Sequence, residues 1–194
     1  MRTSTRRRTP GEDVLEENVG ELEGKVVVIT GASRGVGRAT ALACAAEGAA
    51  VGMIARGREE LEEAAAEVWE RGGRCVAVAA DVADESAIQA AFAQFEAELG
   101  GVDALVNNAA INVPGPAESY SLTDWRRVID TNLTGAFVCS RTAIPALRRR
   151  GGGNIIAIAS GAAKQGYPRL GAYSASKFGL LGLMQSLAAE LEAD

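Results

Sequence analysis

The sequence predicts one α/β domain in which helices cover both faces of a doubly wound parallel sheet. From residue 24 onward, apolar strand-like runs alternate with alanine-rich helical stretches, which is the pattern of βαβ units. The strand-like runs are continuously apolar, as expected when both faces of a sheet are buried. A glycine-rich turn at 30–37 separates the first strand from the first helix, so we expect a ligand site at this end of the sheet.

Each predicted element has a local reason. Five strands are predicted, at 26–29, 50–55, 75–80, 103–107 and 154–159. Helices are predicted at 38–47, 59–71, 85–99, 121–147 and 173–191. The first three helices are each followed directly by glycine, and Gly151–Gly153 ends the fourth, because glycine favours helix ends. The fourth is expected to begin at Ser121 as its N-cap, with Asp124 three residues on.

Composition excludes several classes of function. The formal net charge is -5 and no histidine is present among the 194 residues. We therefore expect no nucleic-acid partner, and a Ser-His-Asp triad and histidine-containing metal sites are excluded. The three cysteines are widely spaced in apolar surroundings and are expected to be reduced thiols in a cytoplasmic protein. No apolar run is long enough to cross a membrane.

Residues 1–23 are interpreted as a polar, disordered extension, and 24–194 as the domain. The extension begins with a basic cluster at Arg6-Arg7-Arg8 and then becomes acidic, a composition that cannot build a core. A targeting or nucleic-acid-binding tail is the alternative, which the neighbouring acidic residues disfavour.

The turn Thr30-Gly31-Ala32-Ser33-Arg34-Gly35-Val36-Gly37 is a candidate phosphate site. Glycines allow a sharp turn out of the strand, and the N–H groups at the start of the next helix are suited to an anion. A turn of this kind is by itself more often only a tight turn, so the rest of the chain must decide between the two interpretations.

Tyr173 and Lys177 are a candidate acid–base pair. They are four residues apart on a predicted helix, so their side chains share a face. A phenol has a pKa near 10, and a neighbouring ammonium favours its ionised form. The alternative is an ordinary surface tyrosine and lysine.

Further motifs occur together with this pair, in a fixed order along the chain. They are Thr30-Gly31-x-x-x-Gly35-x-Gly37, Asp81-Val82, Asn107-Asn108-Ala109-Ala110, Asn132, Ser160 and Tyr173-x-x-x-Lys177. With them the chain, from about Gly24 to its last residue, resembles the short-chain dehydrogenase/reductase family. Within that family it is similar to the single-domain enzymes that resemble 3-oxoacyl-[acyl-carrier-protein] reductase. The resemblance implies a Rossmann fold with strand order 3-2-1-4-5.

The resemblance also implies catalytic roles for four residues. Tyr173 would be the general acid for carbonyl reduction and the base for alcohol oxidation, while Lys177 would lower its pKa and bind the nicotinamide ribose. Ser160 would donate a hydrogen bond to the substrate oxygen, and Asn132 would hold a water that links Lys177 to solvent. This arrangement requires no metal.

A dinucleotide would be bound by residues that the same resemblance indicates. Asp81 would hydrogen-bond the adenine amino group with Val82 beside it, Asn108 would line the path of the adenine ribose, and Asn107 would tie neighbouring strands together. Ala110 replaces the glycine usual in this motif, so we expect a slightly crowded loop. The full set is Gly31, Ser33, Arg34, Gly35, Val36, Gly37, Arg56, Asp81, Val82, Asn108, Tyr173 and Lys177.

The choice of dinucleotide depends on charge. An NAD enzyme of this type usually has an acid at the end of the second strand, where this chain has Ala55 followed by Arg56. Arg34 in the glycine turn is a second guanidinium near the same place. Two arginines favour a 2′-phosphate, so we predict NADPH over NADH. The alternative is that Arg56 is a solvated loop charge beside Glu59 and Glu60.

The substrate is expected to be a small ketone or alcohol that enters a neutral pocket. Members of the family form oligomers through the helices that correspond to those beginning at Ser121 and Tyr173, so a homo-oligomer is expected. They also continue into further strands beyond the tyrosine helix, so a chain ending at Asp194 is expected to lack the last strands and to leave the fifth strand as an edge. The alternative function is that of a non-catalytic dinucleotide-binding remnant or interaction subunit.

Overall fold

Five parallel strands form one sheet at the centre of the molecule. The structure is a computed structural model that describes residues 20–192. The strand order β3-β2-β1-β4-β5 confirms the prediction. The central strand β1 pairs with β2 on one side and β4 on the other, so that Ile29 lies between Met53 and Val106. The strand bounds are β1 Val26–Thr30, β2 Ala50–Ala55, β3 Arg74–Ala79, β4 Ala104–Asn107 and β5 Asn154–Ala157.

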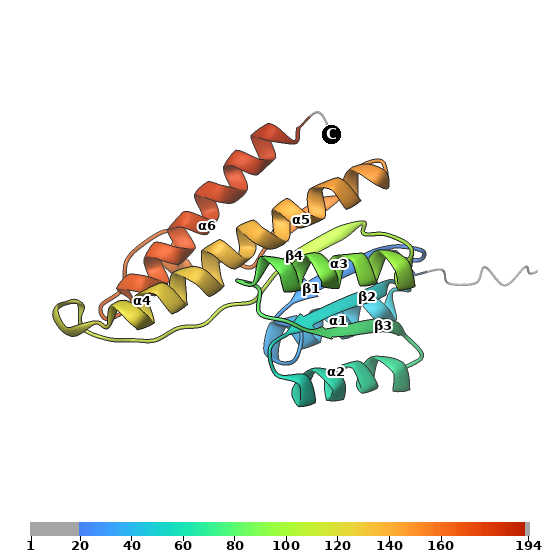
Figure 1. Ribbon diagram of the computed structural model, residues 1–194, viewed down its shortest axis with the longest axis horizontal. Coiled ribbons are helices and arrows are strands. Elements are labelled where there is room, and N and C mark those ends of the chain that lie inside the picture. The colour runs from blue at the N-terminus through green and yellow to red at the C-terminus, as the bar shows by residue number, and fades with distance from the viewer. Residues whose placement is uncertain (1–19, 193–194) are drawn as a thin grey trace, which may run out of the picture.

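Helices cover both faces of this sheet (Figure 1). One core cluster packs α1 and α2 against the sheet, through residues such as Ala41 and Leu61. The other packs α3 and α5 against the opposite face, through Phe95 and Val138 among others. The helix bounds are α1 Gly35–Ala46, α2 Arg58–Glu70, α3 Glu85–Leu99, α4 Leu122–Ile129, α5 Gly135–Arg149 and α6 Gly171–Glu190.

The predicted uninterrupted α-helix at 121–147 is wrong in one respect. A π-helix, η2 Asp130–Thr134, lies between α4 and α5. The helical axis continues, but the wider turn buries Thr131 and Asn132, and the Asn132 side chain bonds both backbone groups of Ile111. Periodicity in the sequence does not reveal such a turn, because its cause is this contact with a distant loop.

The N-terminal part of the description begins with a turn at 21–24. Leu22 donates its N–H to the carbonyl oxygen of Glu47 at 2.9 Å. The prediction of disorder for the extension falls mainly on residues 1–19, which lie outside the described residues. Within the described part of the chain, none of the helices combines the length and hydropathy that a membrane span requires.

Candidate active site

The glycine turn joins β1 to α1 by close backbone packing. A Cβ on Gly31 would lie 2.9 Å from Cα of Ala109, and one on Gly37 would lie 2.2 Å from the carbonyl oxygen of Gly31. Since the first is also at φ +66°, both positions require glycine. The first and third glycines therefore hold strand, helix and the loop after β4 together.

Gly35 differs from its two neighbours, because its surroundings are open. It has φ +54°, and no atom lies within 4 Å of the position of an added Cβ. It begins α1, whose N-cap Arg34 makes no side-chain capping bond and whose first turn has no acidic residue. Unpaired N–H groups at the start of a helix of 12 residues attract anions. The turn is therefore chemically suited to a phosphate.

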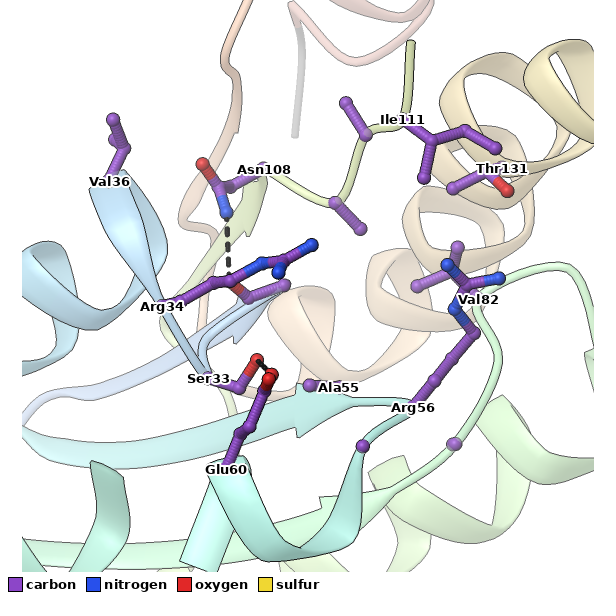
Figure 2. Close-up of a pocket in the computed structure, with 15 residues that line it drawn as sticks. Ser33, Arg34, Val36, Ala55, Arg56, Glu60, Val82, Asn108, Ile111 and Thr131 are labelled. Atoms are coloured by element: carbon purple, nitrogen blue, oxygen red, sulfur yellow. Dashed lines mark hydrogen bonds between the residues drawn. The ribbon is translucent and has the colours of Figure 1, made fainter. Parts of the chain in front are cut away.

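A cavity of about 490 Å³ opens beside this turn (Figure 2). Its size is typical of small-molecule sites. Arg34 and Arg56 reach into it from two sides (Figure 2). Of the cofactor residues predicted from the sequence, those that line it are Gly31, Ser33, Arg34, Val36, Arg56, Val82 and Asn108.

Asp81 does not line this cavity. Instead it forms an ion pair with Arg56. Its Oδ2 is 3.7 Å from Nη1 of Arg56, and its Oδ1 accepts the N–H of Ala83 at 3.0 Å. Both partners of the ion pair are substantially exposed, so it is weak. The cavity is also not lined by Gly35 or Gly37, nor by the pair Tyr173 and Lys177.

Two asparagines at the end of β4 make hydrogen bonds inside the protein: Asn107 is the last residue of the strand, and Asn108 follows it. The amide of Asn108 donates to the carbonyl oxygens of Thr30 at 2.9 Å and Gly31 at 3.2 Å, which pins the turn from the cavity side. Asn107 donates to Oγ of Ser140 at 3.0 Å. Its side chain therefore ties β4 to α5, while its backbone carbonyl oxygen accepts the N–H of Ile158 at 2.9 Å and so joins β4 to the end of β5. The Thr30 hydroxyl adds a side-chain bond to the backbone pairing of β1 with β4 by donating to the carbonyl oxygen of Val106 at 3.4 Å.

Lys177 is buried at the start of α6 and oriented by the backbone. Its side chain is 2% exposed. Its Nζ donates to the carbonyl oxygen of Ile158 at 2.7 Å and lies 5.8 Å from the centre of the Tyr173 ring. Burial lowers the pKa of this lysine from its usual 10.5. The structure thus brings the predicted pair together beside the end of β5.

Asn132 connects the π-helix to both the loop after β4 and α6. Its Oδ1 accepts the N–H of Ile111 at 2.8 Å, and its Nδ2 donates to the Ile111 carbonyl at 2.9 Å. The same Nδ2 donates to Oγ of Ser176 at 3.0 Å, and the Ser176 hydroxyl donates to the carbonyl oxygen of Tyr173 at 2.7 Å. A chain of hydrogen bonds therefore fixes the π-helix against the helix that carries the tyrosine.

Ser160 lies after β5 as the N-cap of a short 3₁₀ helix, η3 Gly161–Ala163. Its Oγ accepts the N–H of Ala162 at 3.1 Å, which leaves its hydroxyl proton free to be donated to a ligand. The short helix packs against α6. Ser160 and Tyr173 therefore come from neighbouring segments, although no direct bond between them is found within residues 20–192.

The loop before α4 and the loop before α6 are joined by a backbone hydrogen bond. Gly115 donates its N–H to the carbonyl oxygen of Arg169 at 2.9 Å, and the Tyr120 hydroxyl donates to Val113 at 2.6 Å. Arg169 has φ +66°, a conformation that few non-glycine residues adopt. The loops before α4 and before α6 are thus held next to each other at the side of Tyr173.

Sequence reasoning missed several residues of this region. Ile111 lines the cavity and is also bonded by Asn132. It therefore joins the cavity to the Tyr173 cluster, which comprises Asn132, Ser160, Tyr173, Ser176 and Lys177. Ser176 provides the link between Asn132 and Tyr173. Glu60 contributes a carboxylate to the cavity wall. The sequence did offer a signal for Glu60. An acid is typical at the end of β2, where this chain has Ala55, and Glu60 follows five residues later.

Comparison with known proteins matches the chain to one family. Residues 25–194 match the family model described as short chain dehydrogenase. The chain is 40% identical, over 87% of its length, to D-threitol dehydrogenase of Mycolicibacterium smegmatis, and spans 65% of that protein. It is 37% identical, over 88% of its length, to 3-oxoacyl-[acyl-carrier-protein] reductase of Synechocystis, of which it spans 69%.

Solved structures agree with this match. A crystal structure of NAD+-bound xylitol dehydrogenase superposes with a TM-score of 0.87 at 33% identity, over 89% of this chain and 67% of that one. A 3-ketoacyl-ACP reductase of Sinorhizobium meliloti gives a TM-score of 0.84 at 38% identity, over 87% of this chain and 67% of its own. These relatives carry names of enzymes that act on different substrates.

Proposed function

Because the chain belongs to the short-chain dehydrogenase family, we propose that it transfers a hydride between NADPH and a carbonyl or secondary alcohol, with Tyr173 as general acid and base. One observation carries the proposal. The buried Nζ of Lys177 lies 5.8 Å from the centre of the Tyr173 ring, with its position set by the carbonyl of Ile158. A fixed ammonium at this position would stabilise the negative charge that develops on the phenolic oxygen as its proton is transferred.

Tyr173 would give its phenolic proton to the substrate oxygen in reduction and take it back in oxidation. Lys177 stabilises the phenolate that remains and binds the ribose next to the nicotinamide. Ser160 donates its hydroxyl to the same substrate oxygen where negative charge develops. The nicotinamide, when bound, supplies or accepts the hydride.

Asn132 and Ser176 hold the acid–base group in place. Their hydrogen-bond chain ends at the backbone of Tyr173, so it positions the turn of α6 that carries the phenol. Since both polar groups of the Asn132 amide have protein partners, the role proposed for Asn132 toward a water uses the remaining lone pair of its Oδ1.

The preference for NADPH rests on Arg34 and Arg56. Both line the cavity beside the glycine turn, and guanidinium groups bind phosphate through paired hydrogen bonds. The turn itself would hold the pyrophosphate at Gly35 and the start of α1. The adenine would be contacted by Val82 and by Asp81, which also pairs with Arg56. The NAD+ in the xylitol dehydrogenase structure belongs to that protein and leaves the preference of this chain to be measured.

We also propose a homo-oligomer that forms through α4, α5 and α6. These helices expose large apolar side chains, which monomeric proteins rarely gather in one region: Leu122, Trp125, Phe137, Phe178 and Leu181. The three free cysteines support the proposal of a cytoplasmic location.

The test is a titration of the purified chain with NADPH, followed by absorbance assays with a panel of ketones and 3-oxoacyl thioesters. Tyr173→Phe is expected to keep NADPH binding and to lower turnover at least a hundredfold, because it removes only the phenolic hydroxyl that acts as acid and base. Trp69→Phe, which changes an exposed aromatic on α2 outside the cavity and the proposed oligomer surface, is the control and is expected to keep its activity. Light scattering of the same samples gives the oligomeric state.

Two outcomes contradict parts of this proposal. Turnover that Tyr173→Phe leaves unchanged assigns the acid–base role to another group. NADPH binding without turnover of any substrate supports the alternative, a dinucleotide-binding module that does not catalyse.

A further inference from the structure

We propose that Glu60 is a specificity-determining residue whose carboxylate opposes the binding of a 2′-phosphate and limits the preference for NADPH. The inference rests on the proposed function, since it concerns the part of the cavity that would hold the adenosine ribose. Glu60 lines the cavity from the first turn of α2 (Figure 2).

The carboxylate lies between the glycine turn and the end of β2. Its Oε2 is 3.5 Å from the hydroxyl of Ser33 and 3.7 Å from the position of a Cβ on Gly57. The contact with Ser33 is long for a hydrogen bond between oxygens. The carboxylate is therefore free to accept a bond from a ligand hydroxyl without losing a strong internal partner.

Counting acids changes the charge balance of the cavity. The arginines alone give two positive charges, but Asp81 is 3.7 Å from Arg56 and Glu60 stands in the wall itself. Arg34 makes no ion pair with any residue of the described part of the chain. One uncompensated guanidinium and one free carboxylate therefore face the same ligand.

Glu60 supplies the acid that the end of β2 lacks. An acid there normally accepts the ribose 2′-hydroxyl, and this chain has the small side chain of Ala55 instead. Because only Arg56 and Gly57 separate β2 from α2, an acid in the first turn of the helix reaches the same cavity. This carboxylate would accept a hydrogen bond from the ribose 2′-hydroxyl, whereas its negative charge would repel a 2′-phosphate.

The test isolates the 2′-phosphate with two nucleotides. Calorimetry with 2′,5′-ADP and 5′-ADP would be done on wild type, Glu60→Gln and Glu59→Gln at 0.15 M salt. Glu59→Gln is the matched control, because it removes the same charge from the first turn of α2 at a side chain that does not line the cavity.

Glu60→Gln is expected to bind 2′,5′-ADP about tenfold more tightly than wild type, since one like charge is removed from beside a phosphate. Affinity for 5′-ADP is expected to change by less than about twofold, and Glu59→Gln to change either affinity by less than about twofold because salt screens exposed charges at longer range. Equal changes in both glutamate variants, or none, overturn the role of Glu60 alone. Failure of the wild type to bind either nucleotide overturns the proposed function together with this inference.

Discussion

Gly37 shows how closely the residues of the glycine turn pack. A Cβ there would lie 2.2 Å from the carbonyl oxygen of Gly31, and backbone cannot move aside as a side chain can. We predict that Gly37→Ala lowers the free energy of unfolding by about 3 kcal/mol, through overpacking between strand and helix. Urea unfolding measures this change.

Gly182 is the control for that substitution. It lies within α6, and no atom lies within 4 Å of an added Cβ. Gly182→Ala is expected to raise the free energy of unfolding by about 1 kcal/mol, because alanine has the better helix propensity. A loss of stability of the same size in both variants would contradict the explanation by packing at Gly37.

Single residues also decide the electrostatics of the site. The arginines were visible in the sequence, but their partners were not. Asp81 was expected to contact the adenine, and the structure also places it 3.7 Å from Arg56, whereas Glu60 was given no role in the site. Which charges face one cavity depends on how two loops and a helix start come together, and this information is absent from local sequence.

At the scale of elements, helix starts follow their capping residues. The Ser121 hydroxyl accepts the N–H groups of Thr123 at 3.1 Å and Asp124 at 3.3 Å, which confirms the predicted N-cap. We predict that Ser121→Ala lowers the free energy of unfolding by about 1 kcal/mol, as measured by thermal or urea unfolding.

Ser119→Ala provides the comparison for this cap. Ser119 is an exposed serine two residues earlier and its hydroxyl bonds no described residue. A change within about 0.5 kcal/mol is expected, as for most surface substitutions. If both serine variants lost equal stability, the cap would not be the cause.

The π-helix between α4 and α5 shows where element prediction ends. Its residues, Asp130–Thr134, are mostly weak helix formers, but this composition does not predict a π-turn, and the bonds from Asn132 to Ile111 and Ser176 are what distinguish it. π-turns are often found at functional sites. Here the turn places an amide between the cavity wall and the helix of Tyr173.

At the scale of the molecule, Asp103 joins three segments that are far apart in the sequence. It accepts the N–H of Val26 at 2.9 Å and two bonds from the guanidinium of Arg150, each at 3.1 Å. Burial alone would raise the pKa of Asp103, but its bonds with Arg150 and Val26 outweigh that effect and hold the pKa below 3.8. The start of β1 is thus attached to β4 and to the end of α5.

This carboxylate makes part of the stability depend on acid. Because the folded pKa is lowered, its contribution is fully present above pH 3.8 and is lost as pH falls through the folded pKa. Asp103→Asn is expected to cost about 1.5 kcal/mol near neutral pH, and the difference from wild type should shrink below that range. Urea unfolding at several pH values measures it.

Glu62→Gln serves as the control, since Glu62 and Arg58 form an exposed pair at 3.6 Å on α2. Such pairs contribute less than about 0.5 kcal/mol at any pH. A difference between wild type and Asp103→Asn that stays constant down to pH 3 would contradict the assigned pKa.

The resemblance to the family implied the strand order, whereas the local sequence by itself determined the alternation of strands and helices, the place of the glycine turn and the spacing of Tyr173 and Lys177. These follow from apolar runs, glycine positions and helical periodicity, which act within a few residues. Only the tertiary structure decided that Asn107 bonds Ser140 of α5, that Ile111 joins the cavity to the Tyr173 cluster, and that Glu60 shares a cavity wall with Arg34 and Arg56. The physical reason is that hydrogen bonds and charges act between side chains close in space, and residues distant in sequence become neighbours only when the chain has folded.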